Sequence, residues 1–401
     1  MAIAWAIAVA SSVLGATLRL DGGVRVEGSS RTVDASGLER TTTVAISAQP
    51  QVALTLAAPA LELGARYAPA LRAADVLLSS RTDVLHAAEV RARYLVMPTW
   101  SVLATAGAER GTTDLLTESR QRPAATPEAV PTTAKLRYAA ARADLAVEGS
   151  LDPRTTLSFG AGWFAGGGDD ADSRGVLPVE RGLRGNARLQ WNATRLDVLA
   201  IQCTARGSRL STEGREALAT ALGLWRHRVG REVEARAGAG AAAFWEDVPG
   251  PPAAAGQPVE LRRRTGFLPL GELGVARASE RLHLDQDAAV RLGAVVDRVR
   301  GSIDRVLEAE VSSRWTPNPA LSFGARAVAL FARQDGGDVR RGSADVRADW
   351  RVHPRTALGF GLYGSWQDTR GTGSPSTAPA LPAFVEAGAF ASVRLDLPAW
   401  Q

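Results

Sequence analysis

The sequence predicts an all-β protein, a transmembrane antiparallel β-barrel of about 18 strands, with about 16 strands as the next choice. Residues 343–367 show why. From Ser343 to Val352, apolar side chains alternate strictly with serine, aspartate and arginine, and a period of two indicates a β-strand. A turn at Pro354 leads into a second arm, which completes an antiparallel hairpin. Trp350 and Trp366 close its apolar face at both ends, as aromatic side chains do at the two surfaces of a bilayer.

The opposite face of this hairpin separates a barrel from its main alternative, a soluble β-sandwich. Asp345, Arg347, Asp349 and Arg351 occupy successive positions on that face. Charged groups are costly in a dry core, whereas a water-filled lumen accepts them. A sandwich also has little reason to ring its apolar face with tryptophan at both ends. The alternation therefore favours a barrel with a wet interior.

Length and composition are compatible with this fold. The chain has 401 residues, 45% of them hydrophobic, and its mean hydropathy is -0.06. Such values are typical of soluble proteins, but membrane barrels share them because every second residue faces water. Outside the N-terminus, no apolar run reaches the roughly 18 residues that a spanning helix needs, which excludes a helical membrane protein.

The positive charge is dispersed along the chain. The net charge is +5, and Lys135 is the single lysine, so nearly all the positive charge is arginine. Acidic residues are interleaved with it, which leaves no basic stripe of the kind that binds nucleic acid. The one cysteine, Cys203, excludes an internal disulfide and a cysteine metal site. We expect it to be a buried or lipid-facing small residue.

The start of the chain differs from the rest. Residues 1–16 are apolar and rich in small side chains, as the later parts of a secretory signal peptide are, although no lysine or arginine precedes the apolar run. A first β-strand is the alternative. We expect a signal peptide over residues 1–16 and a single transmembrane barrel domain over residues 17–401.

Segments of period two predict the strands in order. In the first half they cover residues 18–27, 42–56, 61–67, 89–96, 100–106, 135–151, 155–160, 187–191 and 196–198. In the second half they cover residues 217–229, 232–245, 268–280, 281–299, 303–315, 320–324, 343–352, 358–366 and 384–397. Pro50 either interrupts its run or marks a turn, and residues 268–280 alternate poorly. The proline-rich stretches 111–133 and 248–264 are expected to be long outer loops.

One turn-plus-strand unit occurs three times. Its copies are residues 151–160, 316–324 and 352–361, and each has a proline in the turn and ends in Phe-Gly. The intervals between copies are unequal, which excludes propeller blades and favours a series of hairpins. The tight turns are therefore expected on one rim, opposite the longer loops.

The link at residues 300–301 predicts a strand register. Two residues are enough to join neighbouring strands as a hairpin. That register places Arg291 opposite Glu310 and Asp287 opposite Arg314, and opposed charges at both pairs support it.

The last segment, residues 384–397, alternates apolar with polar side chains, and Trp400 stands one place before the end of the chain. Here the chain resembles the bacterial outer-membrane β-barrels, whose last strand carries an assembly signal and usually ends on an aromatic residue. The resemblance is one of architecture and covers the whole chain. It implies a location in the bacterial outer membrane, with outer-membrane lipids and the barrel-assembly machinery as partners. The oligomeric state stays open.

A barrel of about 16 to 18 strands is too wide for its own side chains to fill and leaves an aqueous channel. Barrels of this kind include porins and the conduits through which exopolysaccharides leave the cell. The expected function is passive passage of hydrophilic solutes or of a secreted polymer, and a polymer would add a periplasmic export component as a partner. The alternatives are a non-conducting surface or structural barrel and a membrane-embedded barrel hydrolase. A hydrolase would need a Ser/His or Asp/His pair at the membrane rim, and no local motif marks one.

Inward charged positions are the candidates for lining a pore. They could form a selectivity device, or only a wet wall in which acids and bases neutralise one another. The candidates are Arg91, Arg93, Arg142, Asp144, Glu148, Glu234, Arg236, Asp285, Asp287, Arg291, Glu308, Glu310, Arg314, Asp345, Arg347, Asp349, Arg351, Glu386 and Arg394.

Aromatic side chains sort into two sets. The outward set is expected to mark the two membrane interfaces and comprises Tyr94, Trp100, Trp163, Trp191, Trp225, Trp245, Trp315, Trp350 and Trp366. A sparse inward set could stack on sugar rings or pack within the wall, and it comprises Tyr138, Tyr363, Phe384 and Phe390.

The four histidines, His86, His227, His283 and His353, are scattered and have no metal-ligand spacing. We therefore expect no metal, no cofactor and no catalytic residue in this chain.

Overall fold

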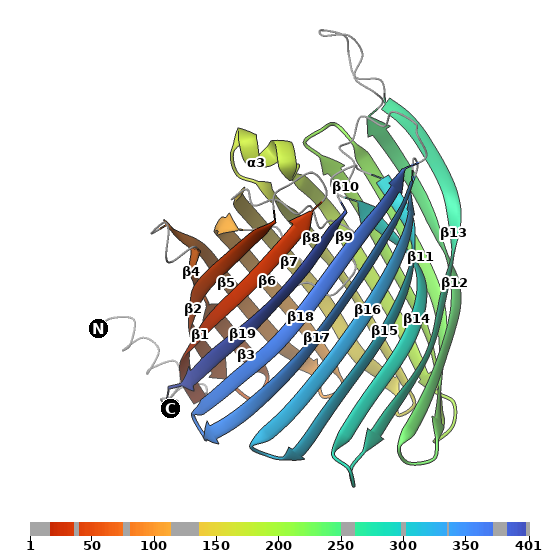
Figure 1. Ribbon diagram of the computed structural model, residues 1–401. Helices are drawn as coiled ribbons and strands as arrows, with labels where there is room; N and C mark the ends of the chain where they lie inside the picture. Colours follow the sequence, from red (N-terminus) through yellow and green to blue (C-terminus); the bar gives the residue numbers. More distant parts are fainter. Residues whose placement is uncertain are drawn as a thin grey trace, which may run out of the picture.

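The structure is a computed structural model of the chain, and it describes residues 17–35, 40–74, 81–113, 136–249, 261–297, 302–334, 337–371 and 383–397. Most of them lie in one antiparallel β-sheet, which closes on itself as a barrel of steeply tilted strands (Figure 1). The predicted fold class is confirmed. Among the described residues, no helix is long and apolar enough to cross a membrane.

The strands follow one another round the wall in chain order. The first ten are β1 (Thr17–Ala35), β2 (Thr41–Ala57), β3 (Leu61–Tyr67), β4 (Ala70–Ala74), β5 (Arg81–Met97), β6 (Trp100–Thr113), β7 (Leu136–Asp152), β8 (Thr155–Gly168), β9 (Glu180–Asn192) and β10 (Asp197–Leu210). The others are β11 (Arg215–Val229), β12 (Val233–Pro249), β13 (Leu261–Ser279), β14 (Leu284–Asp297), β15 (Ser302–Asn318), β16 (Leu321–Gln334), β17 (Gly337–His353), β18 (Thr356–Gly371) and β19 (Phe384–Asp396).

The sheet closes on itself, because β1 pairs with β2 on one side and with β19 on the other. Strands β3 and β4 are two parts of one wall strand. Both pair with β2 and with β5 in a single register, and Pro69 between them has no N–H to give to the ladder. The wall is therefore an 18-strand barrel, and an even number is the rule for bacterial single-chain barrels.

The strand registers determine the width of the barrel. Following paired residues once round the wall leads back to β1 about 22 residues from the starting point. For about 18 strands this stagger gives a tilt of about 40° and, in a round barrel, a backbone radius of about 18 Å. Side chains cannot fill a barrel of that width, so it encloses a lumen.

Short turns join the strands along one rim. Four of them, at residues 98–99, 153–154, 319–320 and 354–355, begin with proline, and an irregularity in the ladder adjoins each one. In three of these turns, the side chain just before the proline accepts a backbone N–H of the turn. At residues 153–154, for example, Asp152 Oδ1 accepts the N–H of Arg154 at 2.7 Å. The turn at residues 98–99 shares the proline and the ladder irregularity of the three predicted copies, although its strand lacks their Phe-Gly ending.

The structure moves several predicted strand limits and decides between the two interpretations of Pro50. β2 runs through Pro50 without a break, because the register of its pairing with β1 continues across the proline. β13 begins at Leu261, so residues 262–264 belong to a strand and not to the predicted loop. The carboxylates of β12 stabilise this arrangement, since Asp247 lies 3.1 Å from Arg263. Most of the predicted loop 111–133 lies outside the described residues.

The predicted register of the next hairpin is also wrong. Arg291 lies opposite Glu308 and Asp287 opposite Ser312, two residues from the expected pairing. The reason is the length of the link, since β14 ends at Asp297 and β15 begins at Ser302. A connection of four residues shifts the ladder relative to one of two.

On the outer rim, α3 (Ala171–Val176) lies between β8 and β9 (Figure 1). Asp170 caps its first turn by accepting the N–H of Ser173 at 2.8 Å, and hydrogen bonds from the Ser173 side chain and N–H hold the pKa of Asp170 below its usual range. The N–H of Arg137 donates to Ser173 Oγ at 2.9 Å. The helix is therefore attached to β7.

Candidate channel lumen

The two faces of the wall differ in chemistry. On β15, Leu307, Val311 and Trp315 are 45–57% exposed on one face. Glu308 and Glu310 alternate with them on the other face and form ion pairs with Arg291. A wide exposed apolar band suits lipid, whereas a paired polar face suits a hydrated interior. The apolar face therefore lies outside and the polar face encloses the lumen.

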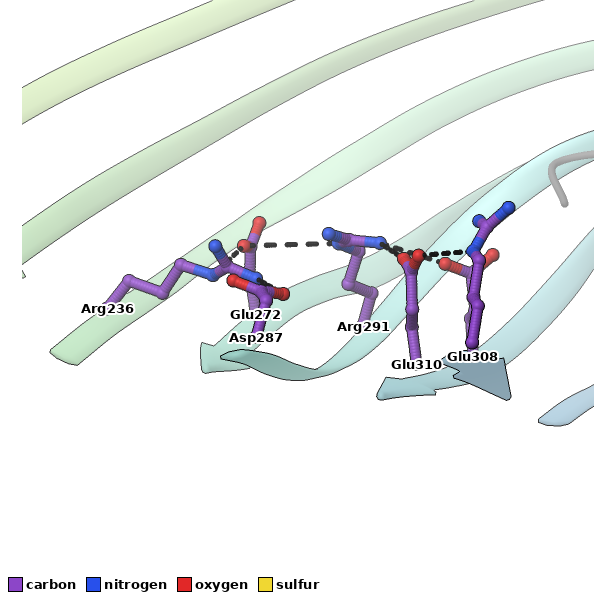
Figure 2. Close-up of polar contacts among 7 residues, drawn as sticks. Arg236, Glu272, Asp287, Arg291, Glu308 and Glu310 are labelled. Carbon is purple, nitrogen blue, oxygen red and sulfur yellow. Dashed lines mark hydrogen bonds and ion pairs between the residues drawn. The ribbon is translucent and has the colours of Figure 1, made fainter. Parts of the chain in front are cut away.

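A chain of ion pairs crosses the inner face from β12 to β16, and Figure 2 shows its members side by side. At one end, Arg236 on β12 lies 3.0 Å from Glu272 on β13 and 2.7 Å from Asp287 on β14. Glu272 is shared, because Arg291 on β14 lies 3.9 Å from it. Arg236 thus links the three neighbouring strands β12, β13 and β14.

At the other end, Arg291 extends the chain of ion pairs to β15. Its Nη1 lies 2.9 Å from Glu308 and 3.0 Å from Glu310, and Arg326 on β16 lies 2.7 Å from Glu310. We call these seven side chains the ion-pair belt; they are Arg236, Glu272, Asp287, Arg291, Glu308, Glu310 and Arg326. Four acids outnumber three arginines, so the belt has no surplus positive charge.

Two hollows adjoin inside the barrel. One, of about 730 Å³, is lined by the inner faces of β1 to β6 and of β15 to β19. The other, of about 460 Å³, is lined by β3 and by β5 to β10. Both are lined by Arg66, Ala68, Ala87 and Glu109, so the two hollows adjoin along these residues. We call the first of them the arginine chamber, because six arginines line it.

Towards the outer rim the wall departs from a regular barrel. β13 pairs with β14 only from Gly271 to Ser279, while its outer half stays paired with β12. The two strands therefore separate above Gly271. β15 reaches β12 across this gap, where the N–H of Ile303 donates to Glu246 Oε2 at 2.5 Å. Glu246 is fully buried there.

Apolar side chains support this contact from the same inner face that carries the belt. They form a buried cluster of Val306, Leu330, Ala332 and Val339, with Val295 packed against it. We call Glu246, Ile303 and this cluster the outer pinch. On the side of β12 to β17, the outer end of the lumen is therefore packed and not open.

The inner aromatic side chains pack within the wall. Tyr363 lies opposite Gly388 and Phe390 opposite Gly361, and a Cβ at either glycine would come within 2.1–2.3 Å of the aromatic side chain. Tyr138 is 1% exposed. These positions favour the packing interpretation over sugar stacking. The Phe384 side chain lies outside the described residues.

Outside the belt, the predicted pore-lining residues divide into paired and unpaired groups. The contacts of the paired group are Arg142–Glu89 at 2.8 Å, Asp144–Arg184 at 2.6 Å, Glu234–Arg226 at 4.0 Å, Arg347–Asp349 at 2.7 Å, Arg394–Asp396 at 2.8 Å and Glu386–Ser365 at 3.1 Å. No ion pair with a described residue is formed by Arg91, Arg93, Glu148, Asp285, Arg314, Asp345 or Arg351. That these side chains line a conducting pore stays a prediction.

Sequence reasoning missed several partners, including Arg184, Glu272 and Arg326. The period of two could have found Arg326, which stands between the outward Ala325 and Ala327. Glu272 lies in the strand whose alternation is poor, so no local signal marked it. Among the described residues, no group of three or more His, Cys, Asp or Glu side chains could hold a metal ion.

The predicted interface aromatics all lie on the outer face. Seven of them are 42–51% exposed, namely Tyr94, Trp163, Trp191, Trp225, Trp315, Trp350 and Trp366. Trp100 and Trp245 are half-buried, and Trp100 packs on Gly149. Cys203 is exposed on the same face. Their role at the membrane interfaces stays a prediction.

Solved structures similar to this one are bacterial outer-membrane barrels. The FrpB iron transporter of Neisseria meningitidis matches with a TM-score of 0.53 and 7% identity, over 94% of this chain and 81% of that chain. OccAB1 of Acinetobacter baumannii matches with a TM-score of 0.52 and 10% identity, over 94% of this chain and 97% of that chain. At such identities the likeness shows the fold alone, and it supports a location in the outer membrane. No curated protein matches the chain.

A family model extends the comparison to the sequence itself. The model of the EpsX exopolysaccharide export family matches residues 6–383, which is nearly the whole chain. The match includes every described strand except β19, and with these strands the belt, the outer pinch and the lining of the arginine chamber apart from Ser392 and Arg394. The chain therefore belongs to the EpsX exopolysaccharide export family.

Proposed function

We propose that this chain is the outer-membrane channel through which an exopolysaccharide leaves the cell. Family membership and the barrel architecture indicate a channel-like, non-enzymatic role. The observation that carries the finer proposal is the pair of adjoining hollows along a polar inner face. A hydrated polymer needs a wide passage with hydrogen-bonding walls and no single tight site.

A periplasmic export component would deliver the polymer to one mouth of this channel. Short turns face the periplasm in bacterial barrels and longer loops face outward. The rim with the four proline turns is therefore the entry side in this proposal, and the arginine chamber adjoins it through Pro319 and Ala320.

Conductance of the full chain in planar lipid bilayers tests the proposal. We expect steady single-channel steps, and we expect exopolysaccharide added on the side of the short turns to interrupt the current. In cells that produce the polymer, deleting the chain should remove surface polysaccharide while its precursors are still made. If the channel conducts steadily and polysaccharide never interrupts the current, the chain acts as a general porin and the export role is contradicted.

The outer pinch favours a second candidate, a non-conducting structural barrel. The buried Glu246 and the apolar cluster around Val306 close part of the outer end. A barrel that stays sealed in the bilayer at every voltage, with and without polysaccharide, would support this second function and contradict the first.

A further inference from the structure

The charges that line the arginine chamber are unbalanced. Arginine side chains from β1 to β3 and from β15 to β19 line the hollow, whereas few acidic side chains do. The chamber is lined by Arg25, Arg66, Arg314, Arg347, Arg351 and Arg394, against Glu109 and Asp349. The hollow itself therefore has a surplus of four positive charges.

Ion pairing does not remove this surplus. Arg25 is paired with Glu27, Arg347 with Asp349, and Arg394 with Asp396, all at 2.7–2.8 Å. Even when Glu27 and Asp396 are counted, arginines outnumber acids by six to four.

The other three arginines have no carboxylate partner among the described residues. Among the described residues, Arg66 donates only to the Gln51 side-chain oxygen, at 2.9 Å, and no described carboxylate lies within 4.0 Å of Arg314 or Arg351. All three side chains are exposed. Their donors are therefore available to a molecule in the lumen.

The ion-pair belt shows that the surplus is local. Each belt arginine contacts at least one carboxylate at 3.0 Å or closer, and the acids are in excess (Figure 2). Belt and chamber lie in the same lumen, and of these two the chamber is the one with surplus positive charge, open space and guanidinium groups that have no carboxylate partner among the described residues.

We infer that the arginine chamber is an anion-selective site that binds carboxylates along a passing polysaccharide. A guanidinium group donates two parallel hydrogen bonds to a carboxylate, which makes unpaired arginine a better match for acidic sugars than lysine. A cleft of one sign between low-dielectric walls also concentrates the opposite ion. This inference rests on the proposed channel function and names its substrate class, an acidic polysaccharide.

Ion selectivity tests the electrostatic half of the inference. We expect the reversal potential of the full chain in a salt gradient to show preference for chloride over potassium. The triple variant Arg66→Gln, Arg314→Gln, Arg351→Gln should lose most of that preference. A control with the same net charge, Arg154→Gln, Arg195→Gln, Arg355→Gln, changes exposed turn residues and should keep it. Preference should also fade between 0.1 M and 1 M salt, because the screening length falls from about 10 Å to about 3 Å.

Blocking of the current tests the ligand class. A carboxylate-bearing oligosaccharide, oligogalacturonate, should interrupt the wild-type current at far lower concentration than neutral maltooligosaccharides, and the triple variant should lose this difference. Equal block by both sugars, or block by inorganic phosphate alone, would overturn the assignment to acidic polysaccharide.

Conductance without any anion preference would overturn the selective site while leaving the channel intact. Absence of conductance would instead count against the channel function itself. Heat-dependent gel migration of each variant shows whether its barrel has folded, so a missing current is not confused with a missing protein.

Discussion

At the scale of single residues, glycine and aromatic side chains form a repeated pair across the strands. In six cases an aromatic ring lies opposite a glycine in register, and a Cβ at that glycine would come within 2.9 Å of the aromatic side chain. The pairs are Trp100–Gly149, Phe164–Gly182, Phe244–Gly266, Tyr363–Gly388, Trp366–Gly342 and Phe390–Gly361. The ring covers the backbone that glycine leaves bare, which helps to fix the register of neighbouring strands.

Replacing one of these glycines should therefore destabilise the barrel. In Gly361→Ala the new Cβ would lie 2.3 Å from the Phe390 ring and 3.0 Å from the Val346 carbonyl oxygen, and overpacking of this kind costs about 1–3 kcal/mol. The measurement is the midpoint of urea unfolding in lipid vesicles. Gly324→Ala is the control, because no atom lies within 4 Å of a Cβ at that position. Equal midpoints for the two variants would contradict the packing role.

At the scale of elements, the described wall includes a place where neighbouring strands part, between β13 and β14. The outer half of β13 pairs with β12 but with no described strand on the side of β14. Backbone groups without ladder partners are costly in lipid. The outer half of β13 is therefore supported by a ladder on one side only among the described residues.

Amide hydrogen exchange should detect this difference. Peptides covering residues 261–270 of β13 should exchange faster than peptides covering residues 337–343 of β17, which pair on both sides. The physical reason is that opening requires breaking one ladder and not two. Mass spectrometry of the barrel in lipid nanodiscs gives the comparison, and equally slow exchange in both segments would contradict the parting of β13 from β14.

The contact between β15 and β12 suggests how the outer end could open. In Glu246→Ala, the N–H of Ile303 loses the carboxylate that accepts it at 2.5 Å, so the outer end of β15 should detach more often. We expect more frequent or larger open steps in bilayer recordings. Glu246→Gln keeps an acceptor and should resemble the wild type. If the alanine variant conducts like the wild type, the contact does not restrict the lumen.

At the scale of the whole molecule, the fold was predictable because its signals are local. A period of two, as from Ser343 to Val352, and tryptophans at both ends of an apolar run are properties of single strands. The barrel class and the number of wall positions follow from counting such strands. That β3 and β4 share one position could not be counted this way, since only their common partners reveal it.

The candidate site was less predictable, because it depends on how strands meet. Arg291 and Glu308 are each inward by their parity, but the link between β14 and β15 decides that they are opposite. The partners of Arg236 come from β13 and β14, and no pattern within β12 identifies them. The outer pinch depends on strands β12 and β15, which are not neighbours in the sheet.

The ion-pair belt has a mechanical consequence. Its ion pairs connect five consecutive strands, β12 to β16, in addition to the backbone hydrogen bonds of the ladder. This part of the wall should therefore be stiffer than the rest and should move as a unit. The opposite sector contains the interruption at Pro69 between β3 and β4. In the proposed export channel, a wide polymer should therefore deform the wall outward at β3 and β4, while β12 to β16 keep their curvature.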